Sequence, residues 1–213
     1  ILIYIYKDMF FMINSLGNLK NLEGVQMERI IKDKTANPAP LGLFGFAMTT
    51  ILLNIHNAGF YPLSVMIMGM GIFYGGAAQL IAGSMEWKKG NTFGMVAFTS
   101  YGAFWLSLVF IWAAPTVFKL PSADPISMGF YLGIWGLITF ALFIGTLNGN
   151  TLGKLVFGSL TILFILLSAA NFTGSEVIHK IAGFEGILCG LFAFYEASAI
   201  DINEKLGKNI LPL

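Results

Sequence analysis

Six apolar stretches alternate with short polar segments along this chain, and they carry almost none of its charge. Each stretch is about 18–23 residues long, enough to cross the ~30 Å hydrocarbon layer of a bilayer as an α-helix. The pattern therefore predicts an all-α integral membrane protein whose six transmembrane helices leave no room for a soluble catalytic domain. In chain order the stretches cover residues 40–57, 62–84, 93–114, 127–147, 152–172 and 181–200.

The segments outside the apolar stretches divide the chain into three parts. We expect residues 1–36 to form a partly disordered cytosolic leader, residues 37–203 the six-helix transmembrane domain, and residues 204–213 a cytosolic tail. The printed chain begins with Ile1, and Met27 is a candidate native start. Whether the residues before Met27 belong to the native protein is left open, and an interfacial amphipathic helix is a second interpretation of them.

The distribution of basic residues predicts how the chain is oriented. If the helices alternate in direction, ten Lys and Arg residues fall on the side of the N-terminus, and only Lys119 and Lys180 fall on the opposite side. Cytoplasmic loops of membrane proteins carry an excess of Lys and Arg. We therefore expect a multi-pass protein of the plasma membrane with both termini in the cytoplasm.

Composition narrows the possible functions further. Charged residues make up 11% of the chain, against about 25% in soluble domains. The net charge of +1 gives no reason to expect a nucleic-acid partner, and the single Cys189 excludes an intrachain disulfide. The sequence has no cluster of metal ligands, no Ser/His/Asp spacing and no phosphate-binding loop. We expect no enzyme, no cofactor and no metal site.

Two nearly identical segments precede the third and fifth stretches. Residues 90–94 read GNTFG and residues 149–153 read GNTLG, 59 positions apart. When the two segments are aligned with this offset, Tyr101 is equivalent to Leu160. The first stretch carries a looser version of the repeat, which places Phe46 at the equivalent position. The odd-numbered stretches are therefore expected to be structurally equivalent.

The even-numbered stretches share a different signature, a Gly-Ile pair followed by a large apolar residue, at Gly71, Gly133 and Gly186. Chance similarity among glycine-rich helices is the alternative explanation. If the repeat is real, the protein consists of three parallel helical hairpins around a central pore along the membrane normal. The equivalent Phe, Tyr and Leu of the odd stretches would then meet at one depth as a hydrophobic constriction, an element that can gate by dewetting.

Polar side chains inside the stretches are few, and polar groups in a membrane interior often mark a pathway. Buried amides must either join helices or face water, and both readings stay open here. The candidate substrate-binding residues within the stretches are Thr49, Thr50, Asn54, Tyr74, Gln79, Thr99 and Ser100.

Three titratable groups lie near the ends of the stretches. His56 closes the first stretch, either as a helix-end hydrogen bond or as a vestibule donor that is partly charged near pH ~6.5. Glu185 lies near the outer end of the sixth stretch, and we consider it together with His56 as a possible proton relay. Glu196 lies near the cytosolic end, where we interpret it as a group extending into interfacial water.

Further candidate substrate-binding residues lie where the first helix is expected to start, and they are Asn37, Pro38, Ala39, Pro40, Leu41, Gly42 and Leu43. Asn can cap a helix, and Pro in the first turn loses no needed donor. A helix N-terminus offers free N–H groups and roughly half a positive charge, which suits a carboxylate. A plain helix start is the alternative. No Lys or Arg lies in a stretch centre, which argues against a multivalent anion and favours a small solute.

The NPAPLGL segment at 37–43 closely resembles the acetate uptake transporter family of the acetate/succinate permease type. The resemblance covers about residues 36–213 and continues at 45–46, 48–54, 71–76, 89–94 and 98–102. It implies a six-helix protomer with its own pore, assembled as a homo-hexamer in the lipid bilayer. It also implies a narrow constriction formed by Phe46, Tyr101 and Leu160, and transport of acetate and related monocarboxylates, with succinate in some members.

Other functions were weighed against this resemblance. A water or glycerol channel needs two Asn-Pro-Ala motifs and a pore arginine, whereas this sequence has one such motif and no Arg within the stretches. A structural scaffold would not explain the repeated pore-facing positions. A channel for ammonium or another small neutral solute stays open as the alternative. The choices between anion channel and proton symport, between uptake and efflux, and among carboxylates also stay open.

Overall fold

The computed structural model describes Met12, Asn14 and residues 35–213. Two compact units divide the chain, Ile1–Ala36 and Asn37–Leu213, and the second contains the helices between residues 39 and 206. The predicted leader and the candidate start at Met27 therefore lie almost entirely outside the described residues.

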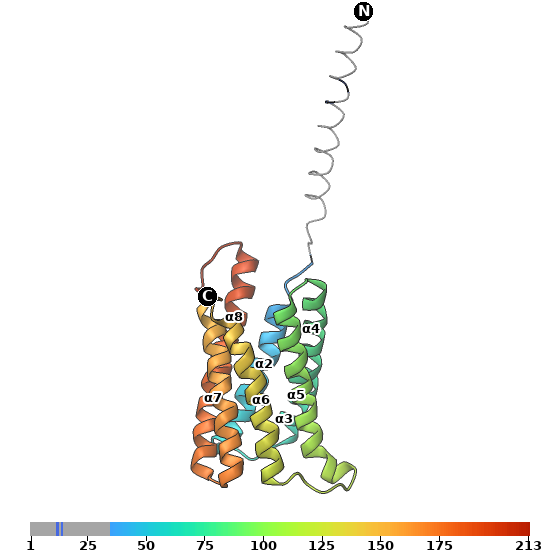
Figure 1. Cartoon of the computed structure of the whole chain (residues 1–213), viewed down its shortest axis with the longest axis vertical. Helices are drawn as coiled ribbons and strands as arrows, with labels where there is room; N and C mark the ends of the chain where they lie inside the picture. The colour runs from blue at the N-terminus through green and yellow to red at the C-terminus, as the bar shows by residue number, and fades with distance from the viewer. Residues whose placement is uncertain (1–11, 13, 15–34) are drawn as a thin grey trace, which may run out of the picture. The chain divides into compact units, whose positions relative to one another are not determined.

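The second unit is built from helices, of which six spans are long and apolar enough to cross a membrane (Figure 1). This confirms the predicted all-α fold with six membrane-length helices. Five spans are single helices and the second span is composite, made of α3, η1 and α4. The elements are α2 (Ala39–Asn57), α3 (Val65–Met70), η1 (Gly71–Ala78), α4 (Gln79–Lys88), α5 (Thr92–Val117), α6 (Pro125–Thr146), α7 (Thr151–Thr173) and α8 (Glu176–Leu206).

The sixth span is longer than the apolar pattern predicts. Its helix starts after Ser175, whose Oγ accepts a hydrogen bond from the Ile178 amide at 3.4 Å. It stops at Gly207, which has a left-handed φ of 62° that favours glycine. The helix therefore extends beyond the apolar residues at both ends, from the cap at Ser175 to the stop at Gly207. The predicted tail boundary at 203/204 consequently falls within α8.

The second span contains a π-helix, η1, that the sequence pattern did not predict. The wider turn carries the Tyr74 carbonyl so close to α2 that a Cβ on Gly45 would lie 2.6 Å from that oxygen. Thr49 of α2 donates a hydrogen bond to the Met70 carbonyl at 3.4 Å, just before the π-helix begins. π-Helical turns occur frequently at functional sites, and Gln79 follows this one directly.

Asparagine side chains explain the repeated GNTxG segments. Asn91 Oδ1 accepts a hydrogen bond from the Gly94 amide at 3.1 Å, and Asn150 Oδ1 accepts one from the Gly153 amide at 2.6 Å. Both are N-caps, which satisfy backbone donors that have no partner in the first helical turn. The repeat is therefore a repeated helix start.

The other helix starts use different residues. At the start of α2 the N-cap position is held by Pro38, and Asn37 Oδ1 accepts a hydrogen bond from the Ala39 amide at 3.1 Å. Asp124 caps α6 by accepting hydrogen bonds from the Ile126 and Ser127 amides. Those bonds, first of all the one from the Ser127 amide, lower the pKa of the Asp124 carboxyl below its ordinary value.

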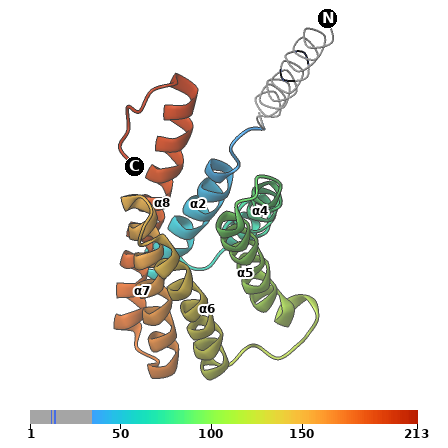
Figure 2. The ribbon, with the colours of Figure 1, turned by 45° about the horizontal axis from the view of Figure 1, so that its top comes forward.

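The six spans surround a common interior, as the tilted view in Figure 2 shows. α8 packs closely against α2 and α7, α6 packs against α7, and α4 with η1 packs against α5. The first glycine of each Gly-Ile signature lies at one of these helix contacts. Each faces a residue of the neighbouring odd-numbered span, and the three residues faced are equivalent in the repeat, eight positions after Phe46, Tyr101 and Leu160. The pairs are Gly71 with Val109, Gly133 with Ser168, and Gly186 with Asn54.

The backbones of α5 and α6 stand further apart than those of the other neighbours, and long side chains bridge them. Phe104 of α5 stacks on Tyr131 of α6 with ring centroids 5.9 Å apart, and it forms a T-shaped contact with Trp135 with ring centroids 5.1 Å apart. Tyr131 also shares a hydrogen bond of 2.7 Å with Ser107. This pair of helices is therefore joined by rings and hydroxyl groups rather than by close backbones.

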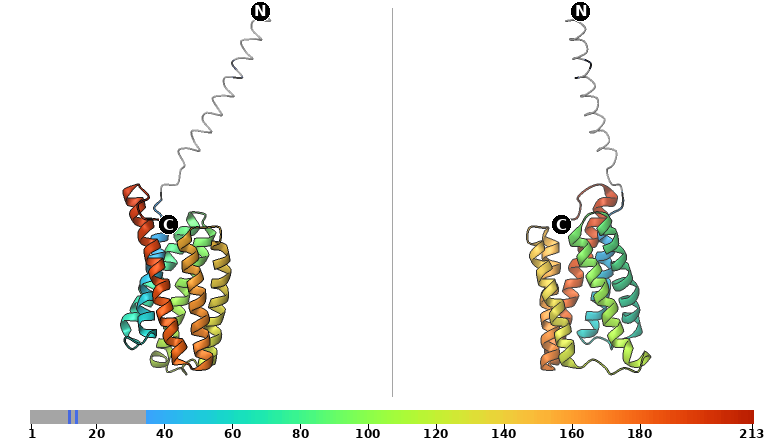
Figure 3. Two further views of the ribbon diagram at one scale, coloured as in Figure 1. Left: turned by 90° about the vertical axis from the view of Figure 1, so that its left-hand side faces the viewer. Right: turned by 45° about the vertical axis from the view of Figure 1, so that its right-hand side comes forward.

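The end of the chain turns back after α8 (Figure 3). Asn203 holds this turn: its Oδ1 accepts hydrogen bonds from the Ile210 and Leu211 amides, and its Nδ2 donates one to the Leu211 carbonyl at 2.7 Å. Asn203 is buried. The last residues are thus attached to the end of α8.

Close packing at Gly183 generates a stability prediction. A Cβ at Gly183 of α8 would overlap the backbone of Asn57 and Ala58, at the end of α2. We expect Gly183→Ala to lower the midpoint of thermal unfolding in detergent by roughly 2–8 °C, because backbone cannot move aside as a side chain can. Gly69→Ala is the matched control, since a Cβ there meets nothing within 4 Å. Equal midpoints for the two variants would contradict the packing described.

Candidate functional site

Two cavities lie at opposite ends of the second unit. The Asn91 pocket, of about 280 Å³, lies where α5 and α7 begin. The His179 pocket, of about 400 Å³, lies at the other end, among the end of α2, the start of α8 and the α5–α6 connection. Together they are the candidate site.

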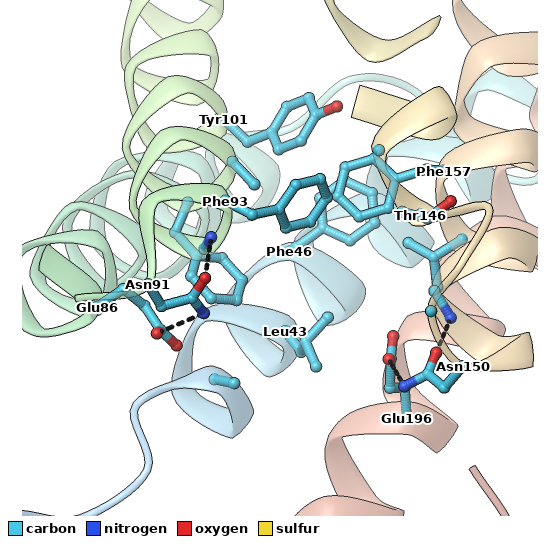
Figure 4. A pocket seen from close by; sticks show the side chains of 18 of the residues that line it. Leu43, Phe46, Glu86, Asn91, Phe93, Tyr101, Thr146, Asn150, Phe157 and Glu196 are labelled. Carbon is cyan, nitrogen blue, oxygen red and sulfur yellow. Dashed lines mark hydrogen bonds between the residues drawn. The ribbon is translucent and has the colours of Figure 1, made fainter. Parts of the chain in front are cut away.

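The Asn91 pocket is lined mainly by apolar side chains, several of them aromatic (Figure 4). The predicted trio Phe46, Tyr101 and Leu160 comes together in its wall, with exposed fractions of 6%, 4% and 3%. The rings of Phe46 and Tyr101 lie 5.8 Å apart between centroids. The Tyr101 hydroxyl donates a hydrogen bond to Thr139 Oγ1 at 3.0 Å, which anchors the ring to α6.

A second set of equivalent residues lies in the other pocket. Leu53, Leu108 and Leu167 all line the His179 pocket, and each follows a member of the first trio by seven positions. Seven residues are about two helical turns, or roughly 10 Å. Sequence reasoning missed these leucines, although the same offsets of the repeat would have found them.

Two carboxylate–amide pairs stand on opposite sides of the Asn91 pocket (Figure 4). Asn91 Nδ2 donates to Glu86 Oε2 at 2.8 Å, and Asn150 Nδ2 donates to Glu196 Oε1 at 3.0 Å. Glu196 is only 7% exposed. Its interpretation as a group extending into interfacial water is therefore wrong, because Asn150 supplies a partner inside the protein.

Among the described residues with buried polar atoms that lack a hydrogen-bond partner, which also include Thr50, Trp105 and Glu185, Gln79 has two such atoms and lines the Asn91 pocket. It is fully buried, and neither its Nε2 nor its Oε1 has a hydrogen-bond partner among the described residues. Buried polar atoms without partners are uncommon and call for a reason. An amide held open in a pocket offers one donor group and one acceptor to a small polar solute.

The structure separates the other predicted substrate-binding residues into two groups. Ala39 and Leu43 line the Asn91 pocket together with Gln79. The rest line neither pocket. They are Asn37, Pro38, Pro40, Leu41, Gly42, Thr49, Thr50, Asn54, Tyr74, Thr99 and Ser100.

Several residues of this second group serve in packing between and within helices. Asn54 Nδ2 donates to the Thr50 carbonyl in its own helix at 2.9 Å, and its Oδ1 accepts from Asn57 at 3.0 Å. Thr99 lies so close to α4 that a Cβ on Gly83 would overlap its hydroxyl. The polarity of Asn54 is thus used within the protein, and Thr99 takes part in the close packing of α4 against α5.

The His179 pocket contains both histidines of the chain. His56 Nδ1 lies 2.8 Å from the Tyr61 carbonyl, and His179 Nε2 lies 3.2 Å from Asn57 Oδ1. His56 therefore makes the helix-end contact and also lines the His179 pocket, and its role as a vestibule donor stays a prediction. Sequence reasoning did not single out His179, although it is the chain's second and last histidine.

Glu185, the second member of the predicted relay, lines neither pocket. It is half-buried on α8, and its Oε2 is buried without a hydrogen-bond partner among the described residues. The structure consequently does not bring Glu185 and His56 together in one cavity. The proton relay built from these two residues stays a prediction.

Several proteins with known names are similar to this chain in sequence, in structure or in both. The succinate-acetate/proton symporter SatP of Escherichia coli K12 is 51% identical over 180 residues, which are 84% of this chain and 96% of SatP. A solved structure of the bacterial acetate channel SatP superposes with a TM-score of 0.83 at 51% identity, covering 84% of this chain and 99% of that one.

A more distant relative is the ammonia transport outward protein 2 of Saccharomyces cerevisiae. It is 40% identical over 173 residues, which are 78% of this chain and 61% of the yeast protein. The model of the GPR1/FUN34/yaaH family matches residues 19–206, and this match agrees with the resemblance seen at the NPAPLGL segment. The chain belongs to the GPR1/FUN34/yaaH family.

Proposed function

We propose that this protein is a transmembrane transporter or channel for acetate and related short-chain carboxylates, with succinate a further candidate. The observation that carries the proposal is the buried, unpartnered Gln79 amide in a pocket lined by Phe46, Tyr101 and Leu160. The donor group of such an amide suits a carboxylate oxygen, and the apolar wall suits a methyl group. The names of the SatP relatives support the same substrate class.

The constriction that we propose consists of Phe46, Tyr101 and Leu160. The charged side chains in the wall of the adjoining pocket are acids, Glu86 and Glu196. An anion that passes an apolar ring without a fixed positive charge loses hydration that a single amide donor replaces only in part, which costs several kcal/mol. A carboxylate that crosses with a proton avoids much of this cost. We therefore propose proton-linked transport.

The orientation and assembly of the protein are further parts of the proposal. The excess of Lys and Arg on the side of the N-terminus supports cytoplasmic termini. A location in the plasma membrane is proposed because an acetate transporter acts between the cell and its surroundings. The homo-hexamer rests on the family resemblance. On this orientation the Asn91 pocket opens toward the cytoplasm and the His179 pocket toward the outside.

The first prediction concerns the driving force. Acetic acid titrates near pH 4–5, so ~99% or more of it is anion at neutral pH. In proteoliposomes at fixed total acetate, we expect an inward proton gradient to accelerate acetate uptake above that of protein-free vesicles. The membrane voltage is clamped with potassium and valinomycin. Flux that ignores the gradient and follows the clamped voltage would show an anion channel instead.

The same vesicles test the alternative function that the yeast relative suggests. Labelled methylammonium replaces acetate at equal concentration, and the net flux is compared with that of protein-free vesicles. Methylammonium flux without acetate flux would overturn the proposed substrate class and favour the ammonium alternative.

The second prediction concerns Gln79. We expect Gln79→Leu to reduce acetate uptake roughly tenfold or more, because the hydrogen bond to a charged oxygen is lost. Thermal stability should be unchanged or higher, since the variant removes a buried amide that has no partner in the protein. Ser84→Ala, at an exposed hydroxyl of α4 outside both pockets, is the control. Wild-type acetate uptake by a folded Gln79→Leu variant would contradict the assignment.

The third prediction concerns the constriction. We expect Leu160→Ala to widen it and to raise the ratio of butyrate flux to acetate flux by roughly threefold or more, since a pocket distinguishes methylene groups by such factors. Ile162→Ala is the matched control, because Ile162 lies on the same helix and is 52% exposed. If the folded Leu160→Ala variant keeps the wild-type ratio, Leu160 does not limit the pathway.

A further inference from the structure

The two carboxylates of the Asn91 pocket are unusually well enclosed. Glu86 is 3% exposed and Glu196 is 7% exposed, and each accepts a hydrogen bond from an asparagine amide. Carboxylates are seldom this buried unless they are paired. They reach the pocket from different spans, α4 and α8, so an occupant of the pocket lies between them (Figure 4).

Each carboxylate is connected to the start of a helix. The asparagine that donates to the glutamate through Nδ2 accepts a backbone amide through Oδ1, from Gly94 of α5 in one case and from Gly153 of α7 in the other. A helix N-terminus carries partial positive charge that attracts anions. None of α2, α5 and α7 has an acidic residue in its own first turn, and at α5 and α7 a glutamate of another helix, Glu86 or Glu196, is bonded to the capping asparagine.

The unpartnered Gln79 amide in the same pocket supplies an independent sign that a polar ligand binds there. If one carboxylate of a ligand bonds to Gln79, the second carboxylate of a dicarboxylate must lie elsewhere in the small cavity. A proton that accompanies acetate makes it neutral. The same proton leaves a dicarboxylate with one negative charge, which must then pass between Glu86 and Glu196.

We propose that Glu196, assisted by Glu86, makes this protein select monocarboxylates over dicarboxylates. The inference rests on the proposed carboxylate transport and adds a residue that sets its specificity. The mechanism is Coulombic repulsion in a partly desolvated pocket. There, one unit charge several ångströms away lowers the occupancy of the pocket by a singly charged anion, relative to a neutral solute, by roughly threefold to tenfold or more. Asn150 acts as a positioning residue that keeps the Glu196 carboxylate in the wall.

The test compares Glu196→Gln with Asp201→Asn. Gln is isosteric with Glu and its Oε1 can still accept from Asn150, so the variant removes charge and little else. Asp201 is exposed on the same helix and lines neither pocket, so its variant makes the same change in net charge away from the site. Labelled acetate and labelled succinate uptake are measured in proteoliposomes at about pH 7.5, where both succinate carboxyls are ionised in solution.

We expect Glu196→Gln to raise the ratio of succinate uptake to acetate uptake by roughly threefold or more, and Asp201→Asn to leave it unchanged. Glu86→Gln should shift the ratio in the same direction and serves as the second variant if Glu196→Gln does not fold. If the ratio is unchanged in folded Glu196→Gln, or shifts equally in Asp201→Asn, the inference is overturned. The proposed function is still upheld in that case, provided that the wild type takes up acetate. Absence of acetate uptake by the wild type would overturn both.

Discussion

The first turn of an α-helix leaves backbone amides without intrahelical partners, so these amides must find partners elsewhere in the protein or in water. Here the starts of α5 and α7 find them in Asn91 and Asn150. The same two side chains hold Glu86 and Glu196. The requirement to cap two helices thus places both carboxylates in the wall of one pocket, and the chemistry of that pocket follows from how the helices begin.

Close contact at glycine completes the arrangement. Where a small residue faces a neighbouring helix, backbones approach and the interface excludes lipid. Gly186 brings α8 against Asn54, and Gly71 brings η1 against Val109. With these spans held close by small residues, the larger apolar side chains of the interior face one another. Phe46, Tyr101 and Leu160 line the pocket because the helices that carry them are held at this spacing.

Features that repeat along the chain were easier to predict from the sequence than the direction in which a single polar side chain points. Hydropathy indicated six helices because each is long and apolar, and the offset between the GNTxG segments placed Tyr101 and Leu160 in one wall. The side-chain direction of an isolated polar residue has no such signal. Thr49 and Asn54 looked like pathway residues, yet their hydrogen bonds go to main-chain and side-chain groups of the protein.

Two further features depend on tertiary structure alone. A π-helical turn changes the register of the residues that follow it, and hydropathy cannot detect the turn, so the orientation of Gln79 was not predictable. Glu196 lies near an end of the sixth stretch, where exposure to water is the usual outcome. Its partner Asn150 is 46 positions away in the chain, and only folding brings the two together.

The aromatic contact between α5 and α6 gives the bundle a different mechanical character on that side. Helices joined at glycine can separate only if whole backbones slide, which is a collective motion of microseconds to milliseconds. Between α5 and α6, by contrast, the packed rings of Phe104, Tyr131 and Trp135 bridge the helices, and the Tyr131 hydroxyl is hydrogen-bonded to Ser107. The distance between α5 and α6 is therefore set by the size and the hydrogen bonds of side chains, so a substitution of one ring can change the width of this wall, whereas the glycine contacts fix the spacing of the other helices through their backbones.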